Sequence, residues 1–198
     1  MISKSELVAC SALNFTQFGS KRFTLDELAN QLGISKKTIY HYFNKKEELV
    51  QESTAYLLQS YLREIQEPEI ALCKDPLEKI ILIYKKGFEH LKYFSPTFLF
   101  GLKKYYPKAY DLYYSFRNDL VNETIYELFV DAQKLGFVVK EVNLRLVCEL
   151  YFLNLNAIAF GRSSLFDKYT QQEILQHLII NTIKGIVTKD YTNKFIQK

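Results

Sequence analysis

The sequence is poor in the residues that make turns. Its 198 residues include no tryptophan, seven glycines and four prolines. β-Sandwiches and barrels need turn residues about every 8 to 12 positions, so this supply argues against a turn-rich β architecture. At the same time 48% of the residues are hydrophobic and 15% aromatic, which excludes a disordered chain. The composition therefore favours an all-α globular fold.

Cysteine and histidine are too few and too scattered to indicate a metal site. The three cysteines, Cys10, Cys73 and Cys148, are far apart and form no C-x-x-C pair. Neither a disulfide framework nor a zinc site is expected, and the pattern fits a reducing cytoplasm. We expect no metal and no cofactor.

Long apolar runs are missing as well. The most apolar helix-length segment begins at Leu146 and is interrupted by Glu149, Asn154 and Asn156. It falls short of the roughly 18 to 20 apolar residues that span a bilayer, and the chain does not open with a secretory signal pattern. We expect a cytoplasmic protein without a membrane role.

Sequence motifs of the common enzyme classes are absent. The chain has no H-E-x-x-H, no G-x-S-x-G, no P-loop and no dinucleotide-binding glycine pattern. Its three histidines are far apart in the sequence. An enzymatic function is therefore not expected.

Helix caps and hydrophobic periodicity divide the chain into about nine helices. Thr24 with Glu27, and Thr170 with Glu173, have the spacing of capping boxes, and Asn44 with Glu47 is a looser version. Asp75 precedes a proline at a helix start. The helices are expected at residues 4–18, 25–32, 36–42, 45–66, 76–94, 96–103, 107–134, 142–161 and 171–189. We place a domain boundary between residues 46 and 47, giving an N-terminal domain 1–46 and a C-terminal domain 47–198.

The formal charge of +4 is concentrated near the N-terminus. The segment 21–46 carries six Lys or Arg against two acidic residues, which accounts for the whole excess of the chain. Within it Leu25, Leu28, Ala29 and Leu32 share one helix face, and Gly33 follows, where a positive φ is easily adopted. A second short helix with Ile34 and Ile39 as its apolar contacts completes a helix-turn-helix.

The second helix has a polar face that a helical core does not need. Such a helix can be an ordinary solvated surface, but exposed aromatic side chains beside lysines are better suited to phosphates and thymine methyl groups. In a helix-turn-helix this element enters the DNA major groove. The candidate residues on it are Ser35, Lys36, Lys37, Thr38, Tyr40, His41 and Tyr42.

The stretch ACSALNFTQFGSKRFTLDELANQLGISKKTIYHYFNKKEELV resembles the N-terminal domain of the TetR family of bacterial transcriptional regulators. The resemblance is dense over about the first quarter of the chain. It implies that Thr24, Thr38, Tyr40, Tyr42 and Lys46 contact the DNA backbone and that Ser35, Lys36, Lys37 and His41 lie nearest the bases. Many members have Gly where this chain has Lys37, so its base contacts are expected to differ.

The C-terminal two-thirds resembles the family more weakly, in DPLEKI, KKYYP and AQKLGFVV. The last two long helices, Leu144–Phe160 and Gln172–Thr188, are apolar around more of their circumference than one core stripe requires. They are either two core helices or, as the resemblance implies, the interface of a homodimer. A two-fold dimer would read a pseudo-palindromic operator in double-stranded DNA.

Aromatic residues concentrate before this segment and indicate an apolar pocket, although each is compatible with plain core packing. The concentration comprises Tyr84, Phe88, Phe94, Phe98, Phe100, Tyr105, Tyr106, Tyr110, Tyr113, Tyr114 and Phe116. The candidate ligand-binding residues are Tyr84, Phe88, Phe98, Tyr113, Phe116, Tyr151 and Asn154. Unpaired amides are costly in an apolar helix, so Asn154 and Asn156 are expected to find partners.

These observations together predict a ligand-responsive, sequence-specific regulator of transcription. By the family resemblance it is a repressor that a small apolar or aromatic effector of unknown identity releases from its operator. A constitutive DNA-binding regulator, or a nucleoid-associated factor without a ligand, remains the alternative.

Overall fold

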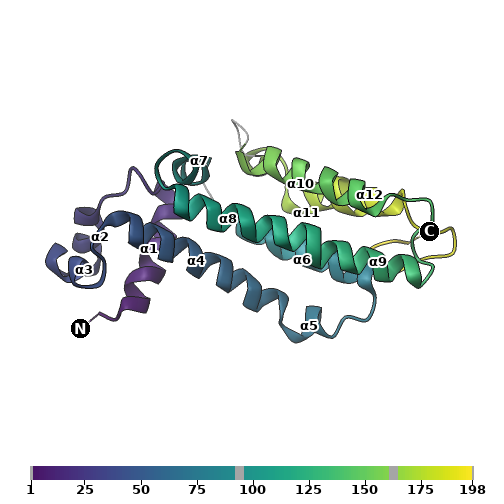
Figure 1. Ribbon diagram of the computed structural model, residues 1–198, viewed down its shortest axis with the longest axis horizontal. Coiled ribbons are helices and arrows are strands. Elements are labelled where there is room, and N and C mark those ends of the chain that lie inside the picture. Colours follow the sequence, from purple (N-terminus) through teal and green to yellow (C-terminus); the bar gives the residue numbers. More distant parts are fainter. Residues whose placement is uncertain (1, 92–95, 161–164, 198) are drawn as a thin grey trace. The chain divides into compact units, whose positions relative to one another are not determined.

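The computed structural model describes residues 2–91, 96–160 and 165–197. The described residues are mainly helical and contain no β-strand, which confirms the all-α prediction (Figure 1). The chain forms two compact units. The first consists of Met1–Ser60 and Tyr93–Phe116, and the second of Tyr61–Lys92 and Arg117–Lys198. The functional boundary between residues 46 and 47 stays a prediction, because compactness does not decide which residues act on DNA or on a ligand.

The first unit begins with three helices whose ends are set by local caps. Helix α1 spans Lys4–Phe18, α2 spans Leu25–Leu32 and α3 spans Lys36–Tyr42, as predicted. Each begins after a side-chain cap, Ser3, Thr24 and Ser35 respectively. Helix α4, Lys46–Ile65, follows and contributes residues to both units.

The loop between α1 and α2 is held by α7, Pro96–Tyr105. Gly19 has φ +85°, and a Cβ atom at this position would lie 2.8 Å from Cγ2 of Thr97. The hydroxyl of Tyr106 donates a hydrogen bond of 3.2 Å to the carbonyl of Ser20. Only glycine permits both the backbone conformation and this close approach.

The second unit is built from longer helices that pack side by side. Helix α6 spans Pro76–Leu91 and contacts both α9, Tyr126–Lys134, and α11, Gln171–Leu175 (Figure 1). Helix α10, Leu144–Phe160, contacts α9 on its other side. The hydrophobic core includes Ile80, Phe129 and Ile179, all of which are fully buried.

The predicted helix 107–134 is continuous. It comprises α8, Pro107–Asp119, a π-helical stretch η1, Leu120–Ile125, and α9. The short helix α5, Pro68–Ala71, and the 3₁₀ turn η2, Leu165–Asp167, were not predicted. Residues 92–94, including Phe94, and residue 161 belong to predicted helices but lie outside the described residues.

The predicted final helix 171–189 is too long. The observed helix runs through α11, the π-helical stretch η3, Gln176–Ile180, and α12, Asn181–Lys184. Beyond it the backbone pairs with residues 137–139: Val139 N donates to Ile186 O at 3.0 Å, and Thr188 N donates to Phe137 O at 2.9 Å. This antiparallel bridge between Val138 and Val187 replaces the helical hydrogen bonds.

Among the helices of the described ranges, none combines the length and the hydropathy that crossing a membrane requires.

Candidate DNA-binding interface

The helix pair α2 and α3 is fixed by hydrogen bonds at both ends of its turn. At the start of α2, Glu27 N donates to Thr24 Oγ1 at 3.2 Å and Thr24 N donates to a Glu27 carboxylate oxygen at 2.6 Å. Gly33 ends α2 in the left-handed conformation, and Ile34 N returns to Ala29 O at 3.0 Å. The predicted capping box and glycine turn are therefore confirmed.

Helix α3 directs one side into the core and the other to solvent. Ile39 is fully buried, whereas Lys37, Tyr40 and His41 are exposed. Tyr40 keeps 47% of its surface accessible, which is unusual for an aromatic residue on a short helix beside lysines. These three side chains therefore lie on the outward face of a rigidly placed helix.

The other predicted contacts on α3 already have partners within the protein. Lys36 pairs with Asp26 at 2.8 Å. Ser35 Oγ accepts from Thr38 N at 3.1 Å and lies 2.9 Å from Thr38 Oγ1. These residues keep α3 in place, and Lys36 would have to leave its carboxylate partner to contact DNA.

Tyr42 is positioned by the N-terminal segment. Its hydroxyl donates to the carbonyl of Ile2 at 2.9 Å, and its ring meets that of His41 edge to face at 5.2 Å. Lys4 pairs with Glu52 at 2.6 Å. Sequence reasoning missed Ile2 and Lys4, because no local pattern links them to residues about 40 positions away.

Thr24 and Lys46 meet at the start of α2. The Thr24 hydroxyl donates to the Glu27 carboxylate at 2.8 Å, and Lys46 Nζ donates to the carbonyl of Phe23. The ammonium of Lys46 also lies 5.6 Å from the Phe15 ring centroid. Burial, followed by the nearby charge of Lys21, lowers the pKa of Lys46.

The seven predicted ligand-binding residues are divided between the two units. Phe98 and Tyr113 are buried in the first unit, with Phe116 partly exposed there. The second unit contains the other four, Tyr84, Phe88, Tyr151 and Asn154. Their role in binding a ligand stays a prediction.

Within the second unit three of the four come together. The Tyr84 ring lies 5.5 Å from that of Tyr151 and 6.4 Å from that of Phe88. Asn154 is instead exposed on α10. The neighbouring Asn156 has the expected partner, since its Oδ1 accepts from Arg117 at 2.8 Å.

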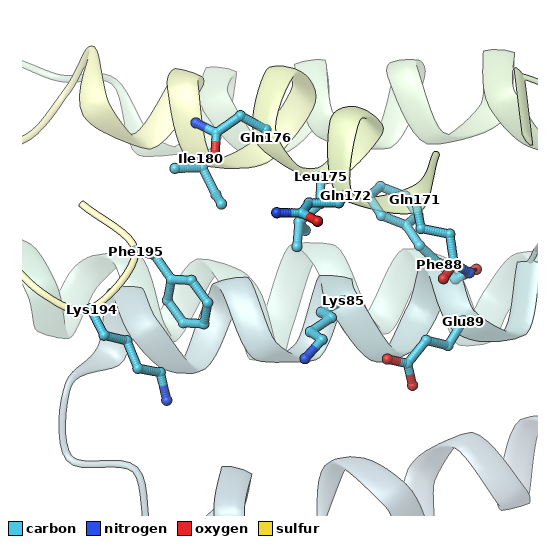
Figure 2. A pocket seen from close by; sticks show the side chains of 10 residues that line it. All are labelled: Lys85, Phe88, Glu89, Gln171, Gln172, Leu175, Gln176, Ile180, Lys194 and Phe195. Atoms are coloured by element: carbon cyan, nitrogen blue, oxygen red, sulfur yellow. Dashed lines mark hydrogen bonds between the residues drawn. The ribbon is translucent and has the colours of Figure 1, made fainter. Parts of the chain in front are cut away.

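A pocket of about 490 Å³ opens in the second unit between α6, α11, η3 and the C-terminal segment (Figure 2). Of the predicted ligand residues it includes Phe88. Lys85 and Glu89 from α6, and Gln171 and Gln176 from the opposite wall, supply polar groups. Sequence reasoning missed these four, because polar residues on surface helices carry no signal until packing brings them together.

One face of α10 exposes leucines in a regular pattern. Leu146 and Leu150 are each 50% exposed, and Leu153 is 61% exposed. Their spacing places them on one stripe of the helix. Contiguous exposed apolar side chains of this kind mark an interaction surface more often than plain solvent contact.

Across the described ranges, no group of three or more His, Cys, Asp or Glu side chains is arranged to hold a metal ion.

A capped helix-turn-helix with a basic and aromatic outward face, attached to further helices, defines the class of helix-turn-helix transcriptional regulators. Residues 14–53 match the family profile described as bacterial regulatory proteins, tetR family. The fold agrees with this match across the whole chain, as the solved structures below show. The chain belongs to the TetR family of transcriptional regulators.

One relative in sequence is YvaF of Bacillus subtilis (strain 168), described as an uncharacterized HTH-type transcriptional regulator. It is 24% identical over 172 residues, which cover 85% of this chain and 87% of YvaF. Among solved structures, the ketosteroid transcriptional regulator KstR2 of Mycobacterium tuberculosis aligns with a TM-score of 0.63 and 17% identity, covering 96% of this chain and 97% of KstR2. The fatty acid degradation regulator FadR of Bacillus halodurans aligns with a TM-score of 0.68 and 15% identity, covering 93% of this chain and 100% of FadR. These relatives are regulators rather than enzymes.

Proposed function

We propose that this regulator binds a pseudo-palindromic operator in double-stranded DNA and that α3 reads the major groove. The observation that carries the proposal is the outward face of α3, where Lys37, Tyr40 and His41 are exposed opposite the buried Ile39. A long basic side chain and two flat rings on one rigid helix match the phosphates and base edges of a groove.

The nine candidate residues divide into two roles. Thr24, Thr38, Tyr40, Tyr42 and Lys46 hold the DNA backbone, while Ser35, Lys36, Lys37 and His41 lie nearest the bases. The partners of Lys36, Tyr42 and Lys46 within the protein support an indirect contribution as well, because they fix α3 and the starts of α2 and α4. Domain 1–46 would then be the DNA-binding part and domain 47–198 the part that dimerises and binds ligand.

The homodimer would form through α10 and the helix that runs from α11 to α12. The exposed stripe of Leu146, Leu150 and Leu153 supports the contribution of α10. The exposed positions of the last helix are polar, among them His177, Asn181 and Thr182, so its part of the interface would be hydrogen-bonded rather than apolar. Two copies related by a two-fold axis would present two α3 helices to the half-sites of one operator.

Regulation would proceed by release from the operator. An effector that binds the free protein more tightly than the operator complex lowers operator affinity, and the operator lowers effector affinity by the same factor. The structural relatives KstR2, a ketosteroid regulator, and FadR, a regulator of fatty acid degradation, support an apolar effector. Repression is the mode proposed here.

Selection of genomic DNA fragments by the purified protein tests the proposal. Enrichment of one pseudo-palindromic sequence, with affinity that falls as salt rises, is the expected result. A variant in which Lys37 and His41 are both alanine serves as the matched control and should lose the enriched sequence while it stays folded. Weak binding that is uniform across sequences would favour the nucleoid-associated alternative. An operator that no apolar compound can displace would favour constitutive regulation.

A further inference from the structure

Two buried tyrosines in the second unit have hydroxyl groups that make no hydrogen bond. Tyr84 on α6 is 4% exposed and Tyr151 on α10 is 1% exposed. Neither hydroxyl finds a partner within the described residues. Their rings touch, with centroids 5.5 Å apart. Two hydroxyl groups from different helices are therefore buried in one small region of the core.

Other buried tyrosines of this protein behave differently. The hydroxyl of Tyr61 donates to Ile83 O at 3.0 Å, and that of Tyr191 donates to the Asp75 carboxylate at 2.6 Å. Folded proteins satisfy nearly all of their buried polar groups, because an unmet hydroxyl loses its hydrogen bonds to water without replacement. A phenylalanine at position 84 or 151 would avoid that loss, so packing alone does not account for both hydroxyls.

The surroundings of the pair are aromatic. Tyr151 stacks on Phe129 at 5.9 Å and Tyr84 lies 6.4 Å from Phe88. Burial raises the pKa of both tyrosines, so each keeps its proton and can act as a hydrogen-bond donor at neutral pH. In this setting a donor hydroxyl is worth more to a ligand than it is at the surface.

We propose that Tyr84 and Tyr151 are the polar end of the effector site and that their hydroxyl groups together bind a carbonyl oxygen of an otherwise apolar molecule. This inference rests on the proposed effector-dependent function. A carbonyl oxygen has two lone pairs, so it can accept from both hydroxyls at once. The effector class is thereby narrowed from apolar molecules in general to those that carry a ketone, ester or related carbonyl group.

Phe88 connects this polar end to the pocket. It lines the pocket of about 490 Å³, and its ring also belongs to the aromatic group around Tyr84 (Figure 2). The wall of the pocket offers Leu175, Ile180 and Phe195 as apolar contacts. The apolar body of the effector would lie against this wall, and rotation of the Phe88 ring would admit the carbonyl end to the two tyrosines.

The experiment uses the full chain and the fluorescent naphthyl ketone prodan, whose emission responds to hydrogen bonding at its carbonyl. The control probe is the same dimethylaminonaphthalene ring system without the propionyl group. We expect Tyr84→Phe and Tyr151→Phe each to weaken prodan binding about tenfold, the effect of losing one buried hydrogen bond. Prodan emission should shift to the blue in both variants, and binding of the control probe should not change.

Tyr61→Phe is the matched control variant, because it removes the same atom from a hydroxyl that already has a partner. It should lower the melting temperature and leave prodan binding intact. Tyr84→Phe and Tyr151→Phe should keep or raise the melting temperature. The inference is overturned if prodan fails to bind the wild-type protein, or if its affinity and emission are the same in both variants as in the wild type.

Operator binding, measured in parallel, separates this inference from the proposed function. Prodan that binds through the tyrosines without weakening operator binding would support the carbonyl site and contradict effector-driven release. Release of the operator by another apolar compound, with prodan binding indifferent to both tyrosines, would contradict the carbonyl site and leave the proposed function standing.

Discussion

The ammonium group of Lys46 donates a hydrogen bond to the backbone carbonyl of Phe23. Lys46 is the first residue of α4, and Phe23 directly precedes the cap of α2, so this bond ties the starts of two helices together. The same ammonium lies over the Phe15 ring of α1. A residue expected to contact phosphate is thus also part of the framework that holds the helix-turn-helix.

Replacing Lys46 by alanine should affect both DNA binding and stability. We expect weaker binding to all DNA sequences and a salt dependence reduced by about one counterion, because one phosphate contact is lost. The free energy of unfolding should fall by about 1 kcal/mol through loss of the hydrogen bond and the ring contact. Affinity titrations at several salt concentrations and urea denaturation measure the two effects. Lys189→Ala removes an equal charge from the second unit and should leave the salt dependence as it was; the phosphate role is wrong if Lys46→Ala does so too.

Lys37 on the outward face of α3 should contribute to base recognition. Lys37→Ala is expected to cost about 1 to 3 kcal/mol against the operator and to relax preference at one operator position only. Binding to a set of operators with single base changes measures this. Lys36→Ala provides the comparison and should have the smaller effect, because Lys36 is paired with Asp26. Equal losses of affinity for every operator variant would reassign Lys37 to the DNA backbone.

The exposed leucines of α10 should hold the dimer together. Leu150→Glu places a charge in the middle of the stripe, and we expect monomers together with a large loss of operator affinity, because paired heads are no longer held in register. Sedimentation velocity reports the oligomeric state. Leu135→Glu, at a leucine 58% exposed at the end of α9, is the control and should stay dimeric. A dimeric Leu150→Glu variant would place the interface elsewhere.

The capping box of α2 should make stability depend on acid pH. Hydrogen bonds from the Thr24 N–H and hydroxyl lower the pKa of Glu27 below its usual 4.5. A carboxyl whose pKa is depressed in the folded state adds stability above its unfolded pKa, and that contribution is lost as the pH falls below 4.5 through the folded value.

Glu27→Gln should therefore be less stable than the wild type at neutral pH, and the difference should shrink as the pH falls below 4.5. Thermal unfolding at a series of pH values gives this comparison. Glu69→Gln on α5 changes the net charge equally and controls for general charge effects. A difference between Glu27→Gln and the wild type that does not vary with pH would show that the carboxylate is not titrating in the capping box.

Much of the secondary structure could be predicted because its causes are local. The ends of α1, α2 and α3 agree with the predicted ranges, and the capping boxes at Thr24 and Thr170 are both formed. Asp75 likewise caps α6 by accepting from Leu77 N and Glu78 N. Each of these interactions joins residues two or three positions apart, which a sequence pattern can record.

Prediction was less accurate where two nearby partners compete or a distant one intervenes. At the start of α4, the N–H of Asn44 donates to Glu48 rather than to the expected Glu47. The final helix stops at Lys184 because Ile186 and Thr188 pair with the backbone of a segment about 50 residues earlier. Periodicity within the segment contains no information about that competitor.

The sequence by itself determined the all-α class, the helix-turn-helix and the outward position of Lys37 and His41, since helix caps and apolar stripes depend on side chains within two turns of one another. Only the tertiary structure decided that Tyr42 would bind the carbonyl of Ile2, that Lys46 would bind that of Phe23, and that the rings of Tyr84 and Tyr151 would meet with their hydroxyls unmet. Those relationships join residues that are 40, 23 and about 70 positions apart. They arise from how whole helices pack, because a side chain's partners across the core depend on every helix that brings them together.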